Sequence, residues 1–307
     1  MKNQSVKITF DKNSGKYAGT VNGQSIKTKH LDYAKKQLTQ FAGCKVEFVV
    51  GGRAEIQEQN DTLAQFDINQ RFTFVEQLVQ MIARKQQASV VITGEGGLGK
   101  SFTVNKVLKA EGLEDLSILD GLIDGAVLPT KRFVTMKGYS TAKGLFRFLY
   151  ENAHSVIVFD DCDSILKDKD ALNLLKGALD SYDRRIITWN AETNDKDLPR
   201  AFEFTGQVVF ISNLDLASVD QAIKSRSMCV DLSMTTDQKL DRMKFIVNSC
   251  EFLPSLSMNI KQDAMNLIVE LKEVAKEISL RTLISVSKIR AGNPNNWKPL
   301  ATYMLAQ

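Results

Sequence analysis

The sequence predicts an α/β protein built on a doubly wound parallel sheet, with a helical region after it and a small α+β unit before it. Nearly continuous apolar runs predict the strands, because the strands of a parallel sheet are buried on both faces. These runs lie at 88–93, 132–136, 155–159 and 207–212. Helical patterns between the main runs lie near 101–111, 141–153 and 165–182. Such alternation of strands and helices is typical of a parallel sheet covered by helices.

The texture of the sequence divides the chain into four parts. Residues 1–50 combine strand-like alternation, turn sequences and one helical pattern, which together predict a small α+β domain. Residues 51–70 are polar and weakly patterned, as expected of a linker. Residues 71–232 hold the predicted sheet as an αβα domain, and residues 233–307 read as a separate helical domain.

The composition is that of an ordinary soluble globular protein. Hydrophobic residues make up 43% and charged residues 25% of the 307 residues. No apolar run approaches the roughly 20 residues of a membrane span, and the N-terminus lacks the apolar core of a signal peptide. The four cysteines have no paired spacing. We therefore expect a cytoplasmic protein with no membrane partner and no zinc site.

The positive charge is concentrated at the N-terminus. Residues 1–50 carry nine lysines and three acids, a balance of nine minus three, or +6, whereas the whole chain has a net charge of +4. A basic skew of this kind favours a nucleic acid or another acidic partner. A solvated, lysine-rich face is an equally good interpretation.

The segment GEGGLGKS, at 94–101, matches the phosphate-binding P-loop, and it follows a predicted strand and opens a predicted helix. Glycines let backbone N–H groups curl around phosphate oxygens, and the start of the helix attracts anions. Lys100 is expected to reach the β- and γ-phosphates of ATP, and the Ser101 hydroxyl is expected to bind Mg²⁺. The weaker dinucleotide pattern GxGxxG overlaps it but leaves Lys100 and Ser101 without a role. The expected nucleotide-binding residues are Gly94, Glu95, Gly96, Gly97, Leu98, Gly99, Lys100, Ser101 and Phe102.

The segment VIVFDDCDSI, at 156–165, ends a buried strand with three aspartates. A P-loop site needs a carboxylate at the end of a neighbouring strand to hold Mg²⁺, and Asp160 fits that role. Asp161 occupies the position of a general base or a water-orienting carboxylate. Asp163 is expected to be structural, as a helix N-cap.

Three later features resemble the AAA+ ATPases. Asn213 follows a buried strand, like the polar sensor 1 residue of that family. Arg226, in the segment SRS before the last strand, resembles the arginine finger that acts in trans. Arg281, in the segment SLRTL, resembles sensor 2 of the lid. The resemblance covers roughly 71–290 in family order, and the details of SRS and SLRTL are also similar to phage-encoded members.

The AAA+ resemblance implies an ATP-hydrolysing, Mg²⁺-dependent motor. An arginine finger at Arg226 implies a homo-oligomeric ring or spiral, usually a hexamer, with ATP at each interface. Asp161, Asn213, Arg226 and Arg281 would then be the catalytic set. Asp161 stands where the family more often has glutamate, so its side chain is one methylene shorter and slower hydrolysis is expected. A phage-encoded member would work in the host cytoplasm.

The segment 131–150 resembles the pore-facing part of AAA+ rings, and it is rich in lysine, arginine and aromatic residues. Lys137 and Tyr139 are the candidate substrate contacts, because an aromatic residue beside a lysine suits either a threaded polypeptide or a nucleic-acid strand. A second candidate is the segment 184–189, which reads as an added strand or hairpin arm. Packing is the favoured role of its Trp189.

Three functions remain open at the level of sequence. The first is a motor that remodels or translocates nucleic acid or a nucleoprotein complex, which the basic segments favour. The second is a protein unfoldase or assembly chaperone. The third is an ATP-switched structural oligomer with slow hydrolysis.

Overall fold

The computed structural model describes residues 4–11, 16–28, 31–42, 46–51, 66–118, 129–190 and 198–307. The chain forms two compact units, Met1–Phe66 and Asp67–Gln307. Within the described ranges, no helix combines the length and the apolar character needed to cross a membrane.

The N-terminal unit is a four-stranded sheet with one helix. Its elements are β1 (Gln4–Asp11), β2 (Lys16–Val21), β3 (Gln24–Thr28), α1 (Leu31–Ala42) and β4 (Val46–Gly51). The strand order is β3-β2-β1-β4, with β4 parallel to β1 and the other pairs antiparallel. Asn22 and Gly23 form the tight turn between β2 and β3 with positive φ angles of 48° and 79°, the geometry that Asn-Gly favours in hairpins. The predicted strands and helix are confirmed.

The larger unit is built on a six-stranded parallel sheet with the order β12-β5-β11-β8-β7-β6. The strands are β5 (Ser89–Thr93), β6 (Glu114–Asp115), β7 (Arg132–Lys137), β8 (Val156–Asp160), β11 (Gln207–Ile211) and β12 (Met228–Asp231). Every residue of β5, β8 and β11 is buried. Each of the four predicted apolar runs therefore forms a strand. Three of these strands are buried throughout, as expected for a parallel sheet, whereas β7 is buried only at Phe133 and Val134.

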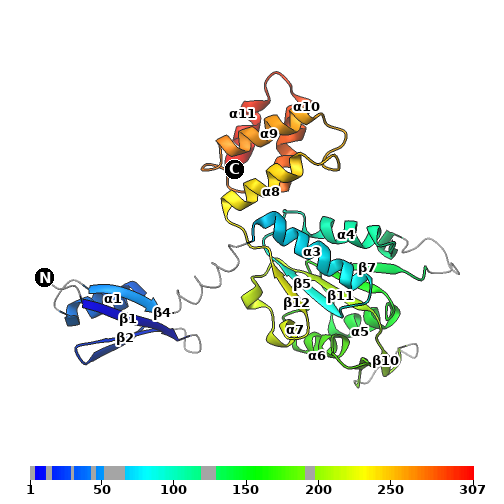
Figure 1. The fold of residues 1–307 in the computed structure, drawn as a ribbon, viewed down its shortest axis with the longest axis horizontal. Coiled ribbons are helices and arrows are strands. Elements are labelled where there is room, and N and C mark those ends of the chain that lie inside the picture. Colours follow the sequence, from blue (N-terminus) through cyan, green and yellow to red (C-terminus); the bar gives the residue numbers. More distant parts are fainter. Residues whose placement is uncertain are drawn as a thin grey trace. The chain divides into compact units, whose positions relative to one another are not determined.

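Helices cover both faces of this sheet (Figure 1). On one face α3 (Ile68–Ala83) and α4 (Lys100–Ala110) share a core with inward residues of the strands. On the other face lie α5 (Ala142–Glu151), α6 (Lys169–Ala178) and the short α7 (Gln221–Lys224). Two turns of 3₁₀ helix, Leu116–Ile118 and Leu216–Ser218, complete the connections.

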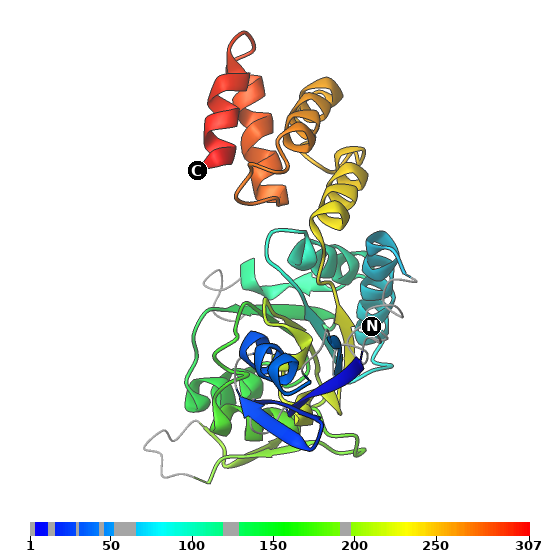
Figure 2. The ribbon, with the colours of Figure 1, turned by 90° about the vertical axis from the view of Figure 1, so that its left-hand side faces the viewer.

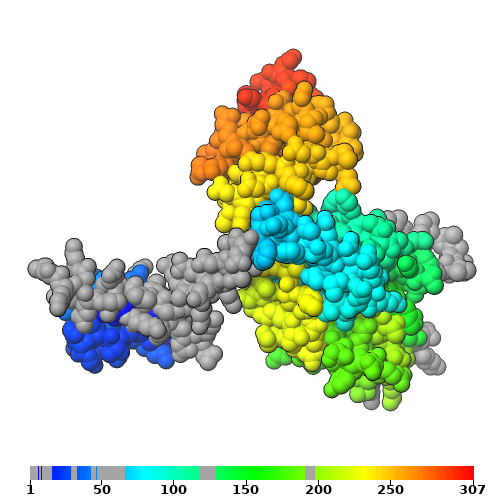
Figure 3. Space-filling view, viewed as in Figure 1, coloured from blue at the N-terminus to red at the C-terminus, as the bar shows by residue number. Residues whose placement is uncertain are grey.

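The chain ends in a group of four helices with its own core (Figure 2). They are α8 (Thr236–Val247), α9 (Met258–Glu270), α10 (Leu280–Gly292) and α11 (Trp297–Ala306). We call this group the lid. Its first helix, yellow in Figure 3, adjoins the cyan α3. There the Arg242 guanidinium stacks 3.7 Å from the centroid of the Phe72 ring and donates to Asn69 Oδ1 at 3.0 Å.

An antiparallel hairpin lies outside the main sheet, as the segment 184–189 predicts. It consists of β9 (Ile186–Thr188) and β10 (Ala201–Glu203). Trp189 is partly buried, with its ring centroid 5.7 Å from that of Phe146 on α5. Packing is therefore the role that the structure gives Trp189.

Two details differ from the sequence-based expectations. The N-cap of α6 is Asp168, whose carboxylate accepts from the Ala171 N–H at 2.8 Å, so the expected N-cap role of Asp163 is wrong. Asp163 instead accepts from Ser212 Oγ at 2.6 Å. Furthermore, β8 is not the neighbour of β5, because β11 lies between them.

The fold class is nevertheless the predicted one. The larger unit is an α/β fold, in which a parallel sheet with helices on both faces is followed by the four helices of the lid. A small α+β unit precedes it. In this arrangement the carboxyl ends of β5, β11 and β8 lie side by side, which brings the loops after them to one edge of the sheet.

Candidate functional site

The phosphate loop joins β5 to α4 in a conformation that depends on glycine. Gly94, Gly97 and Gly99 have φ angles of 128°, 77° and 96°, which side chains of L-residues disfavour. A Cβ atom at Gly94 would lie 2.7 Å from the carbonyl carbon of Leu232, just after β12. The loop therefore lies tightly against the sheet edge and leads directly into the first turn of α4, where anions are attracted.

Lys100 is buried, and its ammonium is held inside the loop. Nζ donates to the carbonyl oxygens of Gly94 and Glu95, the latter at 2.7 Å, and to Asn213 Oδ1 at 3.0 Å. Burial lowers the pKa of Lys100, while Asp161 and Asp160 oppose that shift. The ammonium therefore lies within the loop and beside Asn213.

The two expected magnesium ligands lie beside each other. Ser101 Oγ donates to Asp160 Oδ1 at 2.8 Å, and Asp160 is buried with only 3% of its surface exposed. A hydroxyl and a carboxylate are hard oxygen donors of the kind that Mg²⁺ prefers. The donor set therefore fits Mg²⁺.

Lys137, at the end of β7, also reaches this carboxylate. Its Nζ lies 2.9 Å from Asp160 Oδ2, although most of the Lys137 side chain is exposed. The sequence-based role of Lys137 was contact with a substrate, and nothing in the sequence indicated the ion pair with Asp160. Tyr139 lies two residues further on and is 80% exposed. It does not line the pocket that lies between the phosphate loop, Asp161 and Asn213.

Asn213 connects the lysine to the second aspartate. Its Nδ2 donates to Asp161 Oδ1 at 2.7 Å, while its Oδ1 accepts from Lys100. This bridge exists because β11, which Asn213 follows, lies between β5 and β8. Asp161 itself has a positive φ of 57°, and its N–H donates to Ile211 O at 3.1 Å. The chain thus turns sharply after Asp160 and directs the two carboxylates to different partners.

The lid closes this pocket from the other side. The N–H of Leu280, the first residue of α10, donates to Gly97 O at 2.8 Å. Arg281 follows and lines a pocket of about 130 Å³ together with the phosphate loop, Asp161 and Asn213. The structure therefore brings the expected sensor residues Asn213 and Arg281 together with the loop and with Asp161.

Arg226 is the expected site residue that lies elsewhere. Its carbonyl oxygen accepts from Ser89 Oγ at 3.1 Å, at the first residue of β5. Five residues of extended chain span about 17 Å, so Arg226 lies far from the loop that follows this strand. The guanidinium donates to Ala222 O at 3.1 Å, and its Nε is buried with no hydrogen-bond partner within the described structure. This position is incompatible with a role at the pocket of its own chain.

A second, larger pocket adjoins the first and shares Gly99 and Phe102 with it. It is mostly apolar, measures about 340 Å³, and lies between α4 and the lid. Its lining includes Phe102, Thr103, Phe245, Ile246, Leu280 and Ile284. The sequence indicated only Phe102 of this set. The exposed Phe245 was an available signal, but its helical pattern alone does not show what it faces.

No protein-family model matches the chain. An uncharacterized 36.7 kDa protein in the nrdC-mobD intergenic region of Enterobacteria phage T4 is 26% identical over 280 residues, which cover 85% of this chain and 79% of the phage protein. Among solved structures, C. elegans PCH-2 aligns with 78% of this chain and 68% of its own, at 12% identity and a TM-score of 0.38.

Replacement of Gly97 by alanine should weaken ligand binding specifically. A Cβ atom there would lie 3.1 Å from Ser279 Cβ, in a backbone conformation with a positive φ, and the left-handed region costs other residues about 1–2 kcal/mol. Gly112→Ala is the matched control, because Gly112 has a φ of 81° and no neighbour within 4 Å of its added Cβ. Gly97→Ala should lose at least as much thermal stability as Gly112→Ala, and only Gly97→Ala should raise the Kd for Mg-ATP, by roughly tenfold. Equal affinities in the two variants would contradict this account of the loop.

Proposed function

We propose that this protein is a Mg²⁺-dependent ATPase of the AAA+ type that acts as a homo-oligomer. One observation carries the proposal: Lys100, Asn213, Asp161 and Arg281, from four separate segments, line one pocket beside the Ser101–Asp160 pair. A glycine-rich turn with only a structural role would not require a buried lysine, a bridging amide and a lid arginine at the same place.

Each residue of this pocket has a separate role in the proposed hydrolysis of ATP. Lys100 and Arg281 neutralise phosphate charge, and the loop amides at the start of α4 bind the phosphate oxygens. Ser101 and Asp160 would hold Mg²⁺, which, when bound, supplies charge neutralisation at the phosphates. Asp161 orients the attacking water and accepts its proton, and Asn213 holds the Asp161 carboxylate in position.

The apolar pocket between α4 and the lid is proposed to hold the base of the nucleotide. It begins where the phosphate pocket ends, at Gly99 and Phe102. Apolar walls with a few polar groups at the edge are typical of sites for flat heterocycles. In this arrangement one nucleotide contacts both the sheet and the lid, so the lid position depends on the nucleotide that is bound.

We propose that Arg226 serves the pocket of a neighbouring copy. Its distance from the loop of its own chain supports action in trans. A ring or spiral of identical chains would place one such arginine at each nucleotide, and a hexamer is the form that the family resemblance favours. The number of subunits is an expectation from that resemblance.

The proposed substrate is nucleic acid or a nucleoprotein complex. The excess of lysine in residues 1–50 supports it, as do the exposed Lys131, Lys143 and Tyr139 around β7 and α5.

ATP turnover should then rise on addition of single-stranded DNA or RNA, and the effect should fall steeply with salt. Stimulation by an unfolded protein and none by nucleic acid would favour the unfoldase or chaperone alternative, and ATP-dependent assembly without phosphate release would favour the structural switch. Similarity to a phage T4 protein supports action in the host cytoplasm.

Replacement of Asp161 by asparagine should reduce ATP turnover by about 10²- to 10⁴-fold, the usual contribution of a general base. Binding of Mg-ATP should persist, because Lys100, Ser101 and Asp160 are unchanged. Asp168→Asn is the matched control, since asparagine caps helices as well as aspartate does, and it should turn over ATP normally. Measurement of phosphate release and of nucleotide affinity on the same samples separates the two effects. Turnover of Asp161→Asn within twofold of the wild type would remove Asp161 from the mechanism.

Replacement of Arg226 by alanine should leave nucleotide binding intact and lower turnover by about 10³- to 10⁵-fold, as expected for an arginine finger. Lys100→Ala should abolish binding at its own pocket but keep a functional Arg226. Mixing the two inactive variants should therefore restore part of the activity, because a Lys100→Ala chain can supply its arginine to an Arg226→Ala neighbour. Mixtures without any recovered phosphate release would argue against action in trans.

A further inference from the structure

The phosphate loop contains an acid that is unfavourable for its proposed ligand. Glu95 is the second residue of the loop, its side chain is 57% exposed, and its carbonyl oxygen accepts from Lys100. A carboxylate so close to a site for phosphates repels them through Coulomb interactions. The mechanism proposed above gives the Glu95 side chain no task, so a neutral residue would serve phosphate binding better unless this charge is compensated.

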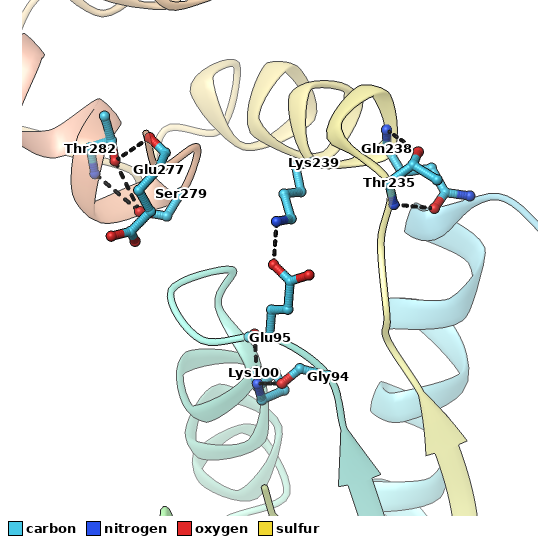
Figure 4. A network of polar contacts seen from close by, with 9 residues as sticks. All are labelled: Gly94, Glu95, Lys100, Thr235, Gln238, Lys239, Glu277, Ser279 and Thr282. Atoms are coloured by element: carbon cyan, nitrogen blue, oxygen red, sulfur yellow. Dashed lines mark hydrogen bonds and ion pairs between the residues drawn. The ribbon is translucent and has the colours of Figure 1, made fainter. Parts of the chain in front are cut away.

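The compensating charge comes from the lid. Lys239 of α8 forms an ion pair with Glu95 (Figure 4). The Lys239 side chain is only 18% exposed, although lysine on a helix surface is normally solvated. A solvent-exposed ion pair contributes little, but this one joins the loop to a different part of the fold and includes a largely buried cation.

The start of α8 is fixed in a way that directs Lys239 to the loop. Thr235 and Gln238 form a reciprocal capping box, with Gln238 Oε1 accepting from the Thr235 N–H at 3.0 Å. The Lys239 N–H donates to Thr235 O at 2.9 Å. Lys239 therefore lies in a rigid first helical turn, which follows β12 after a short connection.

A second lid helix contacts the same loop. The Leu280 N–H donates to Gly97 O, and Ser279, the N-cap of α10, lies against the site of a Cβ at Gly97. Ser279 is itself fixed by Thr282, whose N–H donates to Ser279 Oγ at 3.3 Å and whose Oγ1 donates to Glu277 O at 3.2 Å (Figure 4). The loop is thus attached to α8 through Glu95 and to α10 through Gly97.

We propose that Lys239 is a positioning residue of the nucleotide site, acting through Glu95. By pairing with the carboxylate it cancels the charge that opposes phosphate binding and directs that carboxylate toward the lid. The same ion pair attaches α8 to the loop, so the lid position and the affinity for phosphates change together. This inference rests on the proposed binding of a nucleoside triphosphate at the loop.

The competing interpretation is that Lys239 contacts phosphate directly. The two roles differ in their dependence on Glu95. A positioning lysine matters only while the carboxylate is present, whereas a direct phosphate ligand contributes with or without it. A double-mutant cycle on this pair separates the two roles.

The experiment measures the Kd of Mg-ATP for the full chain carrying Lys239→Met, Glu95→Gln or both. Lys239→Met should raise the Kd roughly five- to tenfold, as expected for one unpaired charge near the phosphates at an intermediate dielectric. Glu95→Gln should bind as tightly as the wild type or more tightly, and Lys239→Met should then have less than a twofold effect when added to Glu95→Gln. Added salt should reduce the loss of Mg-ATP affinity in Lys239→Met, because salt screens the repulsion between Glu95 and the phosphates.

Lys244→Met is the matched control on the same helix, since Lys244 forms only an exposed ion pair with Asp241 at 3.3 Å. Its Kd should equal that of the wild type. Thermal unfolding of every variant without nucleotide verifies that each one folds. If Lys239→Met weakens Mg-ATP binding equally in the wild type and in Glu95→Gln, Lys239 binds phosphate directly and the proposal is overturned. No loss of affinity in either background would also overturn it. Absence of ATP binding by the wild type would instead reject the proposed function, and the positioning role with it.

Discussion

The rest of the site depends on the close packing of two glycines of the phosphate loop against neighbouring segments. Gly94 lies against the main chain of Leu232, and Gly97 accepts from the Leu280 N–H while facing Ser279. No side chain larger than hydrogen fits either position without a shift of its neighbours. The sheet edge, the loop and the lid are therefore in direct main-chain contact, and movement of any one of them must be accommodated by the other two.

Asp160, which ends β8, and the following Asp161 and Asp163 each have a different partner. Asp160 accepts from Ser101 and pairs with Lys137, Asp161 accepts from Asn213, and Asp163 accepts from Ser212. Hydrogen-bond donors and cations beside each carboxylate offset the repulsion between neighbouring negative charges. The buried Lys100 contributes to the same balance, since these carboxylates favour its charged form against the effect of burial.

The sequence predicts the strands and the phosphate loop well because both depend on local signals. Buried parallel strands require continuous apolar runs, and the loop requires glycines before Lys100 and Ser101. Helix α11 was not distinguished from the rest of the helical region, and Pro299 lies in its first turn, where the missing N–H has no intrahelical partner. Contacts between distant segments could not be predicted from the sequence either. The insertion of β11 between β5 and β8, the Lys137–Asp160 pair and the Glu95–Lys239 pair all depend on strand order and lid placement, which no local pattern encodes.

The central claim is that the lid and the phosphate loop form one binding site for a nucleoside triphosphate with its Mg²⁺ ion. Titration calorimetry of the wild-type chain with ATP, with and without Mg²⁺, tests it most directly. The account predicts saturable binding of one nucleotide per chain, strengthened by Mg²⁺ and lost in Lys100→Ala, together with reduced hydrogen exchange at Gly97 and at the start of α10. Binding that survives Lys100→Ala, or binding that leaves exchange in the lid unchanged, would contradict it.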